Sequence, residues 1–218
     1  MDMFGDRREA GRILSDALRE YAGRSDVTVL ALPRGGVPVG YEVAKSLGAD
    51  FDVLVVRKLG LPYHRELAMG AIVSGGAIDL NQDVIARSGV TEREIEAVMA
   101  KESVELERRE RLYRGSRPMT PLEGRIVIVV DDGIATGATM RAALKALRSH
   151  HPARIVAAVP VAPADAPRRM QDVADAFVSV LCPADFYAVG QFYRRFDQTS
   201  DDEVRDLLAQ FDGAGELP

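Results

Sequence analysis

The chain has 218 residues, 47% of them hydrophobic and 28% charged, and its 28 Lys and Arg against 33 Asp and Glu residues give a formal charge of −5. This is the composition of an ordinary globular protein, and its acidic balance excludes a general nucleic-acid binder. The single cysteine, Cys182, excludes an internal disulfide framework or a zinc site built from several cysteines. The aliphatic runs are too short for a membrane helix, and the N-terminal residues lack the apolar stretch of an export signal. We therefore expect a cytoplasmic protein with neither nucleic acid nor membrane as a partner.

Helices alternate with short apolar strands in the first part of the predicted secondary structure. Helical spacing over 6–22 is followed by a β-branched strand over 27–32, a helix over 37–47 and a second strand over 51–56. Such alternation predicts parallel strands that are joined by crossover helices.

The alternation is interrupted between about 59 and 124. Apolar residues on both sides of 74–76 predict a hairpin turn. Thr91 and Glu94 form a capping box that opens a long charged helix, which ends near residue 113. We expect this segment to be an insertion in a single domain spanning 1–218. The sparse apolar face of the long helix favours contact with a second copy, and so a homodimer.

Regular alternation resumes after this insertion. The apolar pattern predicts strands and helices in the order strand 126–130, helix 137–149, strand 155–161, strand 177–181 and helix 200–211. The predicted fold class is therefore α/β, with a parallel sheet flanked by helices.

Two adjacent carboxylates, Asp131 and Asp132, follow the strand over 126–130. Open α/β sheets bind ligands at this carboxyl edge. The small-residue loop that comes next opens a helix, so its N–H groups and the helix dipole can hold an anion. Its residues are Ala135, Thr136, Gly137, Ala138 and Thr139. A phosphate cradle beside carboxylates suits a phosphorylated sugar, although the two acids could also simply cap the strand while Thr136 begins the helix.

The segment DDGIATGATM resembles the PRPP-binding motif of the type I phosphoribosyltransferases, where PRPP is phosphoribosyl pyrophosphate. From about residue 5 to 210, including ELAMGAI and DQTSDDEV, the chain is most similar to the group called predicted phosphoribosyltransferases. The resemblance implies a Rossmann-like sheet with a hood over about 183–212. It also implies that the small-residue loop holds the 5-phosphate of PRPP, and that Asp131 and Asp132 hold the ribose hydroxyls and Mg²⁺.

The loop after the first strand, Pro33-Arg34-Gly35-Gly36, is similar to the pyrophosphate-binding loop of the same family. Its glycines permit close approach of the backbone to an anion, and Arg34 supplies a fork-shaped cation. The resemblance further implies a non-proline cis peptide bond next to Arg34, and a basic residue after the second strand that reaches the pyrophosphate. We assign that last position to Lys58. The alternatives are that Arg34 is a solvated cation at a turn and that Arg57 and Lys58 are solvated cations at a strand end.

An aromatic cluster near the C-terminus, from Phe186 to Tyr193, resembles the hood that holds the base in purine phosphoribosyltransferases. Tyr187 and Val189 are the implied base-binding residues; a core or interface patch is the alternative. Ala135 and Arg194 stand where the 6-oxopurine enzymes carry acids, which argues against hypoxanthine or guanine as the acceptor.

The resemblance also implies a mobile loop that closes over the reacting atoms, in the segment that begins at Leu59. Its titratable candidates for a catalytic group are His64, Arg65 and Glu66, and each could instead be merely solvated.

The function that the resemblance implies is transfer of the 5-phosphoribosyl group from Mg-PRPP to a nitrogen nucleophile, a nucleobase, with release of pyrophosphate. Asp131, Asp132 and Lys58 are then the catalytic residues. Two alternatives stay open: a regulatory module that binds PRPP or a nucleotide without catalysis, and a phosphosugar hydrolase in which water replaces the base.

Overall fold

A five-stranded parallel sheet forms the centre of the computed structural model, which describes residues 3–214 except for the side chains of residues 65, 66, 213 and 214. The order of its strands is β2-β1-β6-β7-β8. Their bounds are β1 Val27–Ala31, β2 Asp50–Val53, β6 Ile126–Val130, β7 Arg154–Val161 and β8 Ala176–Leu181. The α/β class and the parallel sheet predicted from the sequence are thus confirmed.

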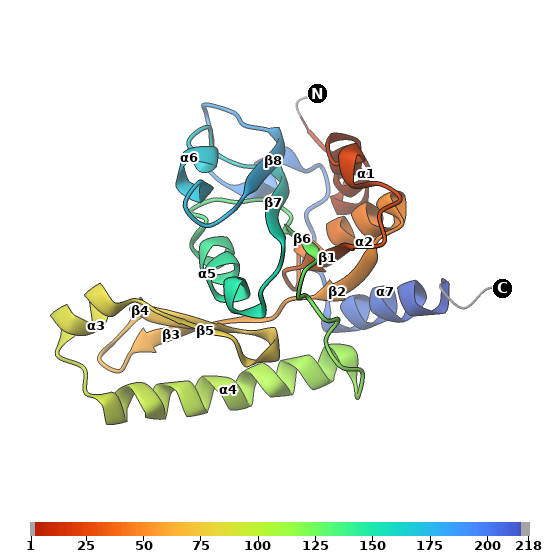
Figure 1. The fold of residues 1–218 in the computed structure, drawn as a ribbon. Coiled ribbons are helices and arrows are strands. Elements are labelled where there is room, and N and C mark those ends of the chain that lie inside the picture. Colours follow the sequence, from red (N-terminus) through yellow and green to blue (C-terminus); the bar gives the residue numbers. More distant parts are fainter. Residues whose placement is uncertain (1–2, 215–218) are drawn as a thin grey trace.

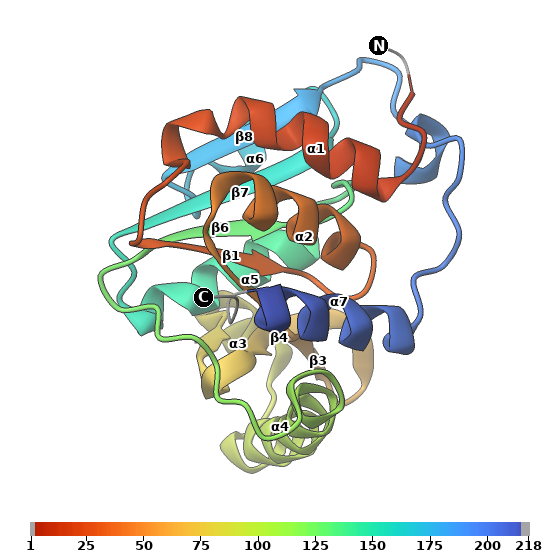
Figure 2. The same ribbon diagram turned by 90° about the vertical axis from the view of Figure 1, so that its right-hand side faces the viewer.

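Helices cover both faces of this sheet (Figure 2). One face carries α1 (Arg7–Ala17) and α2 (Gly36–Leu47), and the other carries α5 (Ala138–Leu147) and α6 (Ala166–Met170). Alternate residues of each central strand enter opposite cores: Ile128 packs toward α1 and α2, whereas Val129 packs toward α5. Burial on both sides explains why these strands are apolar throughout.

The insertion forms a small antiparallel sheet that lies between α5 and α4 (Figure 1). Its strand order is β3-β4-β5. The elements of the insertion are β3 Val56–Leu61, β4 His64–Val73, β5 Ile78–Leu80, α3 Gln82–Ser88 and α4 Glu92–Arg114. The predicted hairpin turn at 74–76 and the capping box of Thr91 and Glu94 are both present.

One predicted strand boundary was wrong. The apolar run over 51–56 is divided between two sheets, because β2 ends at Val53 and β3 begins at Val56. Leu54 still donates its N–H to Ala31 of β1, while the carbonyl of Val55 already accepts from Ser74, beside the insertion sheet. Lys58 therefore lies within β3 and not at the end of the core strand.

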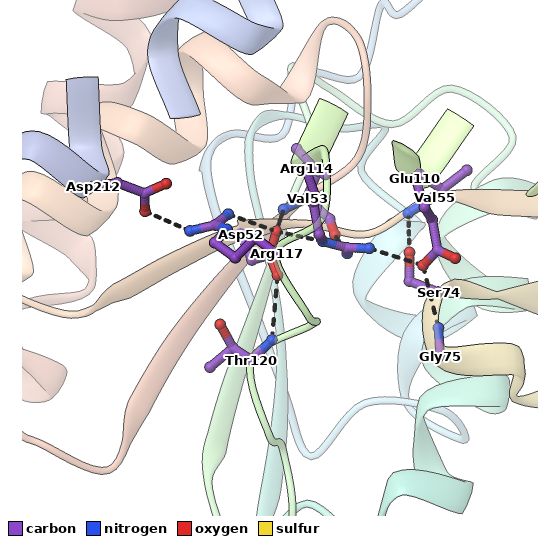
Figure 3. A network of polar contacts seen from close by, with 10 residues as sticks. All are labelled: Asp52, Val53, Val55, Ser74, Gly75, Glu110, Arg114, Arg117, Thr120 and Asp212. Carbon is purple, nitrogen blue, oxygen red and sulfur yellow. Dashed lines mark hydrogen bonds and ion pairs between the residues drawn. The ribbon is translucent and has the colours of Figure 1, made fainter. Parts of the chain in front are cut away.

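The C-terminal end of α4 is anchored to the core by buried charges (Figure 3). Arg114 donates to Asp52 and to Glu110, each at 2.8 Å, and the Asp52 side chain is fully buried. Arg117 lies 3.3 Å from Asp52 and also pairs with Asp212 of α7 (Asp201–Ala214). This network fixes the insertion to β2 and α7, so the position of α4 relative to the main sheet is well defined.

Residues 4–5, near the N-terminus, meet residues 192–195 beside the carboxyl edge of the sheet. Phe4 pairs with Tyr193 in an isolated bridge, and Arg194 and Arg195 donate their N–H groups to the carbonyls of Phe4 and Gly5. The short helix η4, Val189–Phe192, precedes this contact. By contrast α7, which falls within the predicted hood range, packs against α2, α4 and β2. Every helix in the described part of the chain is too short or too polar to cross a bilayer.

Candidate active site

Asp131 and Asp132 follow the last residue of β6 at the carboxyl edge of the sheet, as the sequence predicts. The loop after β1 packs directly against them. A β-carbon on Gly35 would lie 2.1 Å from Asp132 Oδ2, and one on Gly36 would lie 2.9 Å from the Cα of Asp131. The two predicted ligand loops therefore meet, and only residues without a side chain allow this separation.

Burial raises the pKa of both carboxyl groups. For Asp131 the neighbouring charge of Asp132 adds to this effect, and its pKa lies well above the ordinary value. For Asp132 the hydrogen bond and the charge of Arg7 oppose the effect of burial on the pKa. Two acids held close together in a poorly solvated position form a site that gains from binding a cation or hydroxyl groups.

Asp132 is held from two directions by two residues that are far apart in the sequence. Arg7 Nε lies 2.8 Å from Asp132 Oδ2, and the Tyr193 hydroxyl donates to the Asp132 carbonyl at 2.6 Å. Sequence reasoning assigned no role to Arg7. The sequence shows only that Arg7 lies at the start of an amphipathic helix. That pattern does not indicate a contact with a carboxylate 125 residues away.

The small-residue loop between Asp132 and α5 presents unsatisfied donors. Within the described residues, the N–H groups of Ala135, Thr136 and Gly137 donate to no protein acceptor. Gly137 has a φ of +76°, and the loop residues Ala135, Thr136, Ala138 and Thr139 are exposed. This is the geometry of an anion site at a helix N-terminus.

A second residue that sequence reasoning missed supports this loop from behind. Arg169 of α6 donates to the carbonyls of Ala135 and Thr136 at 3.2 and 3.4 Å, and also pairs with Asp165. Its charge lies against the carbonyl side of the loop and leaves the N–H groups open to a ligand. No sequence signal marked this short helix.

The peptide bond between Pro33 and Arg34 is cis, as the resemblance implied. Arg34 is half-buried, and the preceding residue, Pro33, lines a small cavity together with Tyr113 of α4. Burial and a 2.7 Å hydrogen bond to Asp201 raise the pKa of Tyr113 to about 12. The loop over residues 33–36 is thus next to α4 as well as to Asp131 and Asp132.

Lys58 lines a groove of about 890 Å³ between β3 and α4, and Thr139 of the small-residue loop lines the same groove. Lys101 of α4 also lines it, and within the described residues neither Lys58 nor Lys101 forms an ion pair. The neighbouring Arg57 is instead bound to Glu102 at 2.6 Å. The structure therefore brings Lys58 to the same cavity as the predicted phosphate loop.

Of the two predicted base-binding residues, only one contacts the site. Val189 packs so close to Gly133 that a β-carbon there would lie 2.6 Å from Val189 Cγ1. Tyr187 is 88% exposed. Arg194 is also exposed, and its contact with Phe4 is made by the backbone.

The predicted loop candidates lie at the start of β4. His64 is exposed, and the side chains of Arg65 and Glu66 lie outside the described residues. Among the described residues there is no group of three or more His, Cys, Asp or Glu side chains that could hold a metal ion by itself.

Comparison with known proteins agrees with this geometry. Residues 5–196 match the family model described as "Phosphoribosyl transferase domain". Two curated proteins from Mycobacterium tuberculosis strains CDC 1551 and H37Rv, both named "Putative phosphoribosyl transferase", are each 51% identical over 204 residues. These residues are 94% of this chain but 46% of each relative, so the chain spans about half the length of these relatives.

A solved structure extends the likeness to the whole fold. The crystal structure of TT1426 from Thermus thermophilus has a TM-score of 0.86 and 40% identity, covering 96% of this chain and 99% of that one. The family match covers the acid pair and both glycine-containing loops. The resemblance inferred from DDGIATGATM is thus confirmed, and the chain belongs to the phosphoribosyl transferase domain family.

Proposed function

We propose that this protein transfers the 5-phosphoribosyl group of Mg-PRPP to a nitrogen nucleophile, a nucleobase, and releases pyrophosphate. The observation that carries the proposal is the meeting of three features at one sheet edge. They are the half-buried acids Asp131 and Asp132, the loop 135–139 with its unsatisfied N–H groups, and the Arg34–Gly36 loop packed against the acids. Each is suited to a different part of one sugar phosphate.

In this proposal the 5-phosphate binds to the loop 135–139. The N–H groups of Ala135, Thr136 and Gly137 and the hydroxyls of Thr136 and Thr139 are the donors, and the dipole of α5 adds to the field. Asp131 and Asp132 accept hydrogen bonds from the ribose hydroxyls. A carboxylate held here also stabilises the positive charge that develops on the sugar as the bond to pyrophosphate breaks.

Pyrophosphate is assigned to the Arg34–Gly36 loop and to Lys58. Arg34 is half-buried next to α4, and Lys58 lines the groove that it shares with Thr139. A forked guanidinium and an ammonium ion are suited to phosphate oxygens. A leaving group that binds there would depart on the side of the insertion, so the groove between β3 and α4 is a route for its release.

Magnesium fits the donor set as an ion that arrives with PRPP. Asp131 and Asp132 are hard oxygen ligands in a site where burial raises their pKa, but no third acidic or imidazole ligand stands near them among the described residues. Mg²⁺ prefers six oxygens, several of them from water and phosphate. When bound it neutralises charge on pyrophosphate.

The acceptor is assigned to the side of Val189, which packs against Gly133 next to the acid pair. Tyr187 needs to move from its exposed position if its ring is to stack on a base. Ala135 and Arg194 lack the carboxylates of the 6-oxopurine enzymes, so we propose an acceptor other than hypoxanthine or guanine.

A homodimer is proposed through α4, where Val104 is 69% exposed.

Pyrophosphate release from Mg-PRPP with a panel of nucleobases tests the function. Release that requires a base is the expected result. Release without any base would identify a hydrolase instead, and binding of PRPP without release would identify a sensor. The absence of both binding and release would overturn the proposed function.

A further inference from the structure

Arg7 is more tightly held than an ordinary surface arginine. Its Nε donates to Asp132 at 2.8 Å, its Nη1 donates to the Asp197 carbonyl at 2.6 Å, and its guanidinium carbon lies 4.0 Å from the centre of the Phe196 ring. The Arg7 side chain is 12% exposed and the Asp132 side chain 14%. The planar group is therefore fixed on two edges and one face.

A contact between the N-terminal segment and the segment that precedes α7 places Arg7 in this position. We call it the terminal clasp: residues 4–7 together with residues 192–197. Backbone hydrogen bonds and the pair Arg195–Asp6 at 2.6 Å join its two sides. Asp6 caps α1, so Arg7 is the first residue of the helix and its direction is set by the cap.

The two oxygens of the Asp132 carboxylate have different surroundings. Oδ2 is bound by Arg7, and a β-carbon on Gly35 would lie only 2.1 Å from that same atom. Oδ2 is thus enclosed, whereas among the described residues no hydrogen bond is made to Asp132 Oδ1. The carboxylate presents one oxygen in a fixed direction.

We propose that Arg7 is a positioning residue, which holds Asp132 through Oδ2 so that Oδ1 is presented to a hydroxyl group of the sugar. This inference rests on the proposed function, because the hydroxyl is that of the PRPP ribose. The clasp residues Phe196 and Asp197 act through Arg7, which links the C-terminal segment to sugar binding. Arg7 itself does not contact the reacting atoms.

The test is calorimetric titration of Mg-PRPP into the wild type, Arg7→Ala and Arg8→Ala. Arg8 is a matched control: it is the next residue of α1, pairs with Glu42 at 3.2 Å and lies 5.4 Å from the centre of the Tyr41 ring. Loss of the Arg7 group should weaken PRPP binding about 10- to 100-fold, because the carboxylate loses its orientation. Arg8→Ala should bind as the wild type does.

Chemical rescue separates positioning from a structural role. Guanidinium ion, added well below denaturing concentrations, should recover part of the PRPP affinity of Arg7→Ala and leave that of Arg8→Ala unchanged. Arg7→Lys should recover less affinity than the rescued Arg7→Ala, because an ammonium group cannot donate to both acceptors from one plane. An affinity loss that guanidinium does not recover would overturn the proposal.

If Arg7→Ala does not fold, Phe196→Leu provides a second measurement. Phe196 is 38% exposed, and this change removes the ring under the guanidinium together with its contact to the Tyr193 ring, whose centre lies 5.0 Å away. PRPP affinity should fall about two- to fivefold. Wild-type affinity in either folded variant would overturn the role of Arg7 and leave the proposed function intact, whereas a wild type that binds no PRPP would overturn both.

Discussion

Gly35 and Asp132 approach so closely that a β-carbon on Gly35 would lie 2.1 Å from Asp132 Oδ2. The backbone of Gly35 has a φ of −59°, which any residue adopts, so this position needs glycine only for the contact. Gly35→Ala should therefore displace the carboxylate and reduce PRPP affinity by about 100-fold. Isothermal calorimetry with Mg-PRPP measures the change.

Gly23→Ala is the control for that substitution. Gly23 has a φ of +70° and no atom within 4 Å of an added β-carbon. Alanine there should cost about 1 kcal/mol of stability and leave PRPP binding unchanged. Equal PRPP binding by Gly35→Ala and the wild type would contradict the described packing of the two loops.

Asp131→Asn should stabilise the folded protein at neutral pH. The pKa of Asp131 is raised by burial and by Asp132, so the folded state binds the proton more tightly than the unfolded state does. Asp131 therefore contributes its full stabilisation below about pH 4, which is its pKa in the unfolded chain. This contribution is lost as the pH rises through its pKa in the folded state. The thermal midpoint of Asp131→Asn should exceed that of the wild type at pH 7.

This gain should shrink as the pH is lowered toward about 4, where the wild-type carboxyl is protonated as well. Thermal unfolding followed by circular dichroism across this range gives both curves. A stabilisation that is independent of pH would mean that the charge of Asp131 is not its cause.

Tyr113→Phe should remove the part of the loss of stability at alkaline pH that is caused by ionisation of Tyr113. Burial and the hydrogen bond to Asp201 raise the pKa of Tyr113 to about 12 in the folded protein. The stabilisation that Tyr113 contributes is therefore complete below about pH 10, its pKa in the unfolded chain. It is lost as the pH rises from about 10 to about 12. The difference in urea midpoint between wild type and variant should narrow over this range. Tyr187→Phe, at an 88% exposed position, should show no such difference at any pH.

Asp52→Asn should be among the most destabilising single substitutions in the chain. Asp52 is fully buried and is the shared partner of Arg114, whose side chain is 3% exposed, and of Arg117. The substitution removes this buried negative charge and leaves Glu110 as the remaining carboxylate that pairs with Arg114. The expected loss in the free energy of unfolding is about 3–5 kcal/mol by urea denaturation. Asp16→Asn breaks the exposed pair with Arg19 and should cost at most about 1 kcal/mol. Similar losses in the two variants would contradict a structural role for the network in Figure 3.

The parallel core of the fold and the start of the long insertion helix could be predicted because their signals are local. Uninterrupted apolar strands such as 126–130, and a helix start marked by Thr91 and Glu94, depend on a few neighbouring residues. The acid pair and the small-residue loop were predicted for the same reason, because one continuous segment contains both.

The rest of the site depends on contacts between distant segments. Arg7 reaches Asp132 only because residues 4–7 pair with residues 192–197, and helical periodicity carries no sign of that pairing. The break between β2 and β3 was missed because Leu54 and Val55, which connect the two strands, are apolar and buried. Their pattern is the same as that of one continuous strand. Arg169 was missed because α6 has only five residues, too few for a periodic pattern.

We propose that one PRPP molecule binds across Asp131, Asp132 and the loop 135–139. The most direct measurement is a calorimetric titration of PRPP with Mg²⁺ into the wild type and into the double variant Asp131→Asn/Asp132→Asn. The wild type should bind one PRPP per chain, and the double variant should bind at least about 100-fold more weakly, since two hydrogen bonds to charged groups are lost. No binding by the wild type, or equal binding by both proteins, would contradict the assignment of this site.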